Sequence, residues 1–95
     1  MELGLLQLEL HLPVAQSLKQ KRRVVKSLKD RLQTRFNVSV AEVGYLDKWQ
    51  RSSLAIAMVS TDRRYLEASF EKISAFVDQE LLGSAFITAR QLEFF

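Results

Sequence analysis

Residues 6–36, LQLELHLPVAQSLKQKRRVVKSLKDRLQTRF, contain a strand pattern followed by a helix pattern. Leucine alternates with polar residues over positions 6–12, and this period of two predicts a half-buried strand that Pro13 ends. Ser17 and Gln20 have the spacing of a capping box, which marks the start of a helix. Apolar residues then recur at helical spacing, at Leu18, Val25, Leu28, Leu32 and Phe36. The segment therefore predicts a strand connected to an amphipathic helix.

The rest of the chain repeats this alternation of strands and helices. β-branched residues before Gly44 and a continuous apolar run after Ser53 predict two strands joined by a polar hairpin. A second apolar stripe predicts a helix that is capped by Thr61 or Asp62 and ended by Gly83. The expected strands cover residues 3–12, 38–45, 54–59 and 85–95, and the first expected helix covers residues 17–36.

The element order β-α-β-β-α-β predicts one α+β domain over residues 1–95, with a ferredoxin-like fold. Both helices are expected to cover one face of a four-stranded antiparallel sheet. We expect the first and third strands to lie parallel in the centre of that sheet, and both helices to run in the same direction across it.

The other face of the sheet is expected to be open. Ala55, Ala57 and Val59 would form an apolar patch at its centre, to which Phe94 and Phe95 could add. Exposed apolar patches often mark a partner surface, so we expect a homodimer through this face. The alternative is partial cover of the patch by long neighbouring side chains.

Composition excludes several classes of protein. Apolar residues make up 47% of the chain and charged residues 26%, as in folded domains, and the absence of cysteine fits a reducing compartment. His11 is the one histidine, so no zinc site is expected and a hydrogen-bonded strand histidine is the prediction. Phosphate-loop and nucleophile motifs are absent, so we predict no enzyme activity, catalytic residue, metal or cofactor.

No apolar run is long enough for a membrane span and no signal peptide opens the chain, so we expect a cytoplasmic protein.

Positive charge is concentrated in residues 17–36, which net +7 while the whole chain nets +3. At about 100° per residue, five cations fall in an arc roughly 120° wide, away from the apolar stripe. These are Lys19, Arg22, Arg23, Lys26 and Lys29. Like charges at i,i+4 cost about 0.2–0.5 kcal/mol per pair, and cations near a helix start oppose its dipole. The pattern therefore favours an external anion over a solvated face.

Two kinds of external anion are open at this point. The first is phosphate, on RNA or a ribosomal surface. The second is an acidic stripe on the other helix, formed by Glu67, Glu71 and Asp78. With the helices parallel, both stripes would point to the same side and would not face each other within one subunit. They could meet between subunits, which makes an oligomerising protein-interaction module the alternative function.

The loop DKWQR at residues 47–51 is a second candidate site. Trp49 could stack on an unpaired base while its basic neighbours hold phosphate, or it could close the hairpin end of the core. The two central strands lack aromatic residues, so RNA binding on the sheet face is not expected. The predicted nucleic-acid-binding residues are Lys19, Lys21, Arg22, Arg23, Lys26, Lys29, Lys48, Trp49 and Arg51.

Four segments carry a resemblance to a known family: ELHLP at 9–13, SLKQKRRVVKSL at 17–28, RFNVSVAEV at 35–43 and DKWQR at 47–51. They resemble the YlxP-like family, a small bacterial family of uncharacterised function. The family usually has an acid where Gln20 stands and a histidine where Tyr45 stands, so no histidine-like ligand is expected at Tyr45. The resemblance implies a compact α/β fold and no established catalytic residue. Family genes often lie beside those for translation initiation and ribosome-binding factor A, which favours a ribosome or RNA partner.

Overall fold

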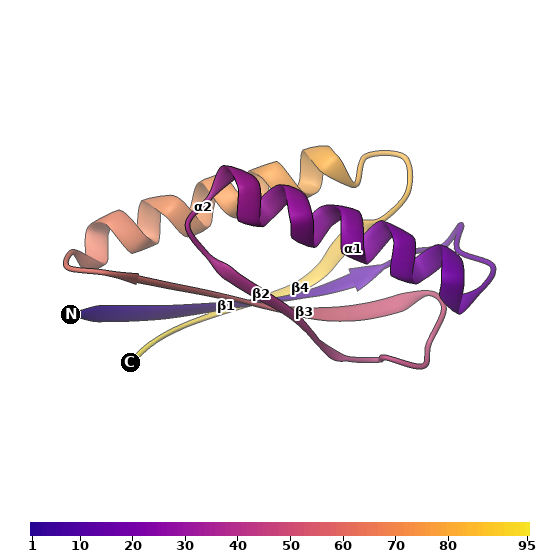
Figure 1. Ribbon diagram of the computed structural model, residues 1–95, viewed down its shortest axis with the longest axis horizontal. Helices are drawn as coiled ribbons and strands as arrows, with labels where there is room; N and C mark the ends of the chain where they lie inside the picture. The colour runs from indigo at the N-terminus through magenta and orange to yellow at the C-terminus, as the bar shows by residue number, and fades with distance from the viewer.

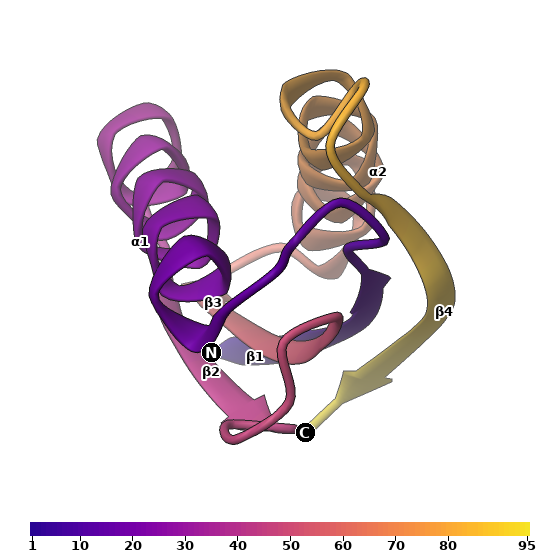
Figure 2. The same cartoon turned by 90° about the vertical axis from the view of Figure 1, so that its right-hand side faces the viewer.

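The computed structural model describes residues 1–95 and contains six elements (Figure 1). They are β1 (Glu2–His11), α1 (Leu18–Arg35), β2 (Ser39–Gly44), β3 (Arg51–Ser60), α2 (Arg63–Glu80) and β4 (Phe86–Phe94). The strands form one sheet in the order β2-β3-β1-β4, and each neighbouring pair is antiparallel. Both helices lie on the same face of this sheet, as Figure 2 shows end-on. The predicted ferredoxin-like α+β fold is confirmed.

Two of the expected directions are wrong. β1 and β3 do lie together in the centre, but they run antiparallel, with Glu2 opposite Ser60 and His11 opposite Arg51. The reason is that α1 carries the chain back so that β2 runs parallel to β1 at the sheet edge, and the following hairpin then reverses β3. α1 and α2 therefore also run in opposite directions across the sheet (Figure 1).

The core lies between the sheet and the two helices. Alternate residues of β1 and β3, including Leu6, Leu8 and Ile56, face the helices and are buried. Gly4 leaves room for the ring of Phe70 on α2, because a Cβ atom on Gly4 would lie 2.5 Å from Phe70 Cε2. This close approach fixes α2 against the central strand.

Hydrogen bonds of the predicted kind fix the starts of both helices. Ser17 Oγ accepts from the backbone N–H of Gln20 at 3.1 Å, and Gln20 Oε1 accepts from the backbone N–H of Gln16 at 2.7 Å. α2 is capped by Asp62, whose side chain accepts from the backbone N–H of Arg64 at 2.9 Å. The sequence pattern therefore located both helix starts.

β3 begins three residues before the predicted strand at 54–59. Its additional residues Ser52 and Ser53 are polar, yet both are buried and paired with β1. Their hydroxyl groups are hydrogen-bonded, Ser52 to Glu42 at 2.8 Å and Ser53 to Gln7 at 3.1 Å. An apolar run alone does not reveal such residues, because buried polar groups are tolerated when they have partners.

The open face of the sheet matches the expectation in part. Ala55 and Ala57 are half-buried there, and Val59 is 58% exposed. Phe94 does not add to this patch, because its ring packs on the helix side of the sheet beneath the guanidinium of Arg63, 4.2 Å from the ring centroid. Neither helix has an apolar stretch of the length and hydropathy that crossing a bilayer requires.

Candidate nucleic-acid interface

Five cations form a continuous surface on α1, which we call the cationic row: Lys19, Arg22, Arg23, Lys26 and Lys29. The opposite face of α1 buries Val25, Leu28 and Leu32, so the row points to solvent. Lys29 is half-buried and the other four are exposed. Lys26 pairs with Asp30 at 2.9 Å, and the other four members have no carboxylate partner. Most of the charge of this surface is therefore free to attract an anion.

The positive potential is reinforced where α1 begins. The first turn of α1 contains no acidic residue. The free N–H groups of a helix N-terminus carry roughly half a positive charge, which adds to Lys19 and Arg22. This end of the row is its most anion-attracting part.

Lys21 does not belong to the interface, and its prediction as a phosphate-binding residue is wrong. Its side chain is 0% exposed, and Nζ donates to Glu42 Oε2 at 2.9 Å. The spacing of four residues to Val25 and seven to Leu28 places Lys21 on the buried face of α1. Helical periodicity could therefore have excluded it from the interface.

The buried ammonium group of Lys21 holds the β2–β3 loop in place. It also donates to three backbone carbonyls, those of Tyr45 at 2.7 Å, Arg51 at 3.3 Å and Leu46 at 3.4 Å. Tyr45 has a positive φ of 59°, a conformation that costs a non-glycine residue about 1–2 kcal/mol. The contacts of Lys21 at both ends of the loop maintain this strained turn.

Gln50 attaches the same loop to the connection between β1 and α1. Its side-chain amide donates to the carbonyls of Pro13 at 3.1 Å and Ala15 at 3.3 Å. Its own carbonyl accepts from the backbone N–H of Leu12 at 2.9 Å. The loop is thus fixed on two sides and held beside the start of α1.

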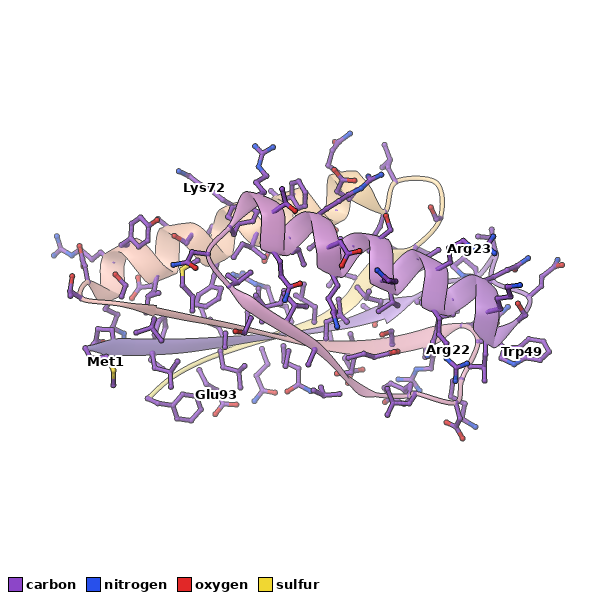
Figure 3. The ribbon with its side chains drawn as sticks, in the orientation of Figure 1. Met1, Arg22, Arg23, Trp49, Lys72 and Glu93 are labelled. Atoms are coloured by element: carbon purple, nitrogen blue, oxygen red, sulfur yellow. The ribbon has the colours of Figure 1, made fainter.

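Trp49 lies at the tip of this fixed loop and is 53% exposed. The alternative in which Trp49 closes the core is therefore excluded. Figure 3 shows its ring projecting from the end of the molecule at which Arg22 and Arg23 also lie. The fold brings the loop and the start of the cationic row to the same end of the molecule.

An open pocket surrounds Trp49, and we call it the Trp49 pocket. It is lined by His11, Asp47, Lys48, Trp49, Gln50 and Arg51. Lys48 is exposed and has no carboxylate partner. Trp49 is the one apolar residue of the lining, so the pocket combines an aromatic ring with charged and polar groups.

Arg51 is engaged within the protein, unlike Lys48. Its guanidinium lies 4.0 Å from the centroid of the Tyr45 ring, donates to Tyr45 Oη at 2.9 Å and lies 3.5 Å from Glu9 Oε2. Arg51 nevertheless remains exposed at the rim of the pocket. Part of its charge is satisfied by Glu9, so less of the charge of Arg51 than of Lys48 is free to attract an anion.

The acidic stripe on α2 points away from the cationic row. Glu71 pairs with Arg90 of β4 at 3.1 Å, which places the stripe on the β4 side of the molecule. Arg31, on the α2 side of α1, pairs with Glu80 of α2. Arg23 lines a groove between α1 and α2 together with Arg31 and Glu80, and the other members of the row lie farther from α2. The expectation that both stripes point to the same side is wrong, because the helices are antiparallel.

His11 is a hydrogen-bonded strand residue, as predicted. Its Nδ1 lies 3.2 Å from the carbonyl oxygen of Gln50, and its ring packs edge-on against Phe86. No group of three side chains in the chain is arranged to hold a metal ion.

Comparisons with known proteins identify relatives without a known activity. A family model described as "Protein of unknown function (DUF503)" matches residues 3–89. "Uncharacterized protein YlxP" of Bacillus subtilis (strain 168) is 48% identical over 64 residues, which are 67% of this chain and 70% of that protein. Neither description names a ligand, a partner or a reaction.

Proposed function

The chain belongs to the DUF503 family, whose function is unknown, and we propose that it is a non-enzymatic protein that binds RNA or a ribosomal surface through phosphate groups. The observation that carries this proposal is the cationic row, in which four of five cations have no carboxylate partner. RNA supplies phosphates in a continuous array, and Lys and Arg are the side chains that bind them.

The arrangement of charge disfavours an acidic stripe as the partner of this row. Glu67 and Glu71 of that stripe already pair with Arg63 and Arg90 of the same chain. A second subunit that docked its stripe on the row would therefore exchange existing ion pairs for new ones. Binding of phosphate groups of an external polyanion to the row would break none of these ion pairs.

A homodimer through the open sheet face is a separate proposal. It rests on the apolar patch at Ala55, Ala57 and Val59, which no helix covers. Such a dimer is compatible with RNA binding, because the cationic row lies on the helix side of the sheet.

Charge reversal at the start of α1 tests the proposed function. We expect the double variant Lys19→Glu, Arg22→Glu to lose most of its affinity for a ribosomal RNA fragment at low salt. The matched control is Arg64→Glu, Lys72→Glu, which reverses two exposed cations of α2 that also lack carboxylate partners. Figure 3 places Lys72 far from Arg22. Equal affinity of the two variants, or no binding of RNA by the unmodified protein, would contradict the proposal.

A further inference from the structure

We propose that the Trp49 pocket binds an unpaired base of single-stranded RNA, while the adjacent cationic row holds the neighbouring phosphates. This inference rests on the proposed function and specifies its ligand. The pocket and the start of the row lie at the same end of the molecule, where Figure 3 places Trp49, Arg22 and Arg23. A strand whose base enters the pocket would thus have its backbone close to the row.

The lining of the pocket matches a nucleobase better than an apolar protein segment. A base has an aromatic face that stacks on an indole ring and polar edges that form hydrogen bonds. The pocket offers one exposed indole ring, and its other five residues are polar or charged. An apolar side chain from a protein partner would meet Trp49 and little other apolar surface.

Groups that can contact a base and its phosphate surround the ring. Lys48 has no carboxylate partner and can hold a phosphate. Asp47 can accept hydrogen bonds from amino groups of a base. His11 uses Nδ1 against Gln50 and leaves Nε2 without a partner in the protein. The pocket therefore presents both donors and acceptors around a stacking surface.

The pocket is formed before any ligand arrives. Lys21 donates to the carbonyls of Tyr45 and Arg51 at the two ends of the loop, and Gln50 is bonded to Pro13 and Ala15. A loop that is already ordered loses little conformational entropy on binding, which strengthens affinity. These contacts give the buried ion pair of Lys21 a positioning role at the pocket.

A preference for single strands follows from this arrangement. Bases within an RNA duplex are stacked on their neighbours and cannot enter the pocket without unpairing. A duplex would use the cationic row alone. Because every base has an aromatic face, we expect the preference to depend on strandedness more than on sequence.

The intrinsic fluorescence of Trp49 provides the test, because it is the one tryptophan in the chain. The protein is titrated with an adenine oligoribonucleotide of about 12 nucleotides, within the usual range of such sites, and with an RNA duplex of the same length. We expect the single strand to quench the fluorescence and the duplex to leave it nearly unchanged. We also expect Trp49→Ala to weaken single-strand binding about tenfold, measured by anisotropy, and Trp49→Phe to restore part of it.

Two further results separate this inference from the proposed function. If single strand and duplex bind equally, and Trp49→Ala changes neither, the pocket inference is overturned, while loss of binding in Lys19→Glu, Arg22→Glu still supports the proposed function. If the unmodified protein binds neither RNA at low salt, both proposals fail. Circular dichroism of Trp49→Ala checks that the variant is folded, which we expect because the ring is largely exposed.

Discussion

At the scale of single residues, four oxygen atoms surround the ammonium group of Lys21. One belongs to Glu42, and the other three are the backbone carbonyl oxygens of Tyr45 and Leu46 in the β2–β3 loop and of Arg51, the first residue of β3. A buried ion pair adds little net stability compared with an apolar pair, but loss of one partner leaves the other charge uncompensated. We therefore infer that the main structural role of Lys21 is to fix the position of the loop.

We predict that Lys21→Met lowers the free energy of unfolding by about 3–5 kcal/mol, because Glu42 keeps a carboxylate that is only 15% exposed. Urea denaturation measures this change. Adding Glu42→Gln should recover part of the loss, since the uncompensated charge is removed. The exposed residue Lys19 supplies the control, and Lys19→Met should change stability by less than about 0.5 kcal/mol. Similar effects of the two methionine substitutions would show that the buried network has no such role.

Lys21 and Trp49 show which side-chain environments can be predicted from the sequence alone and which cannot. Lys21 was predictable from its helical position, because it shares a face with Val25 and Leu28. The exposure of Trp49 was not predictable, since it depends on contacts of its loop with Lys21, Pro13 and Ala15, which are distant in sequence. Local patterns carry no information about such long-range anchoring.

At the scale of elements, α1 combines a buried apolar face with an exposed face that is unfavourable for the helix itself. Lys19 and Arg22 lie near its N-terminus, where the helix dipole favours acidic residues. Lys19 and Arg23 are also like charges at i,i+4. A helix selected for stability alone would carry acids at these positions, and the proposed binding role would account for the cations.

We predict that Lys19→Glu, Arg22→Glu raises the thermal stability of the protein while it removes RNA affinity. An acid at position 19, in the first turn, should contribute about 0.3–1 kcal/mol at low ionic strength. Acids at positions 19 and 22 would also form opposite-charge i,i+4 pairs with Arg23 and Lys26, each stabilising by about 0.2–0.5 kcal/mol. Differential scanning calorimetry at low and high salt measures the gain, which salt should reduce because exposed charges are screened. A drop in melting temperature would mean that the two cations stabilise the fold, and their presence would then need no binding partner.

The directions of the strands and helices could have been predicted from the order of the elements along the chain. A strand, a crossover helix and a hairpin force β3 to run against β1, and this places α1 and α2 antiparallel. The location of Phe94 on the helix side depends on the register of β4 against β1, with Phe94 opposite Gly4. That register includes an irregularity between Glu9 and Leu10, which alternation alone cannot place.

At the scale of the whole molecule, charge is separated across the helix layer. The cationic row faces outward from α1, and the acidic stripe faces the β4 side of α2, where arginine side chains neutralise part of it. The helix face and the end with Trp49 are thus suited to a polyanion. The open sheet face lies on the other side of the sheet and is the surface of the proposed dimer contact.

We predict that the protein forms a dimer through this sheet face and that Val59→Glu dissociates it, because the carboxylate would be buried at the contact. Sedimentation equilibrium measures the mass. Val14→Glu is the matched control, since Val14 is similarly exposed but lies in the connection between β1 and α1. A monomeric unmodified protein, or equal effects of both substitutions, would contradict a dimer at this face.

The salt dependence of RNA affinity tests the central claim most directly. For single-stranded RNA, log K should fall linearly with log of the salt concentration, with a slope of about −0.7 per phosphate contact. We predict that Lys19→Glu, Arg22→Glu makes this slope less steep by at least about 1.4, as two contacts are lost, and that Arg64→Glu, Lys72→Glu leaves it unchanged. A slope that is the same in the unmodified protein and in both variants would contradict phosphate binding by the cationic row.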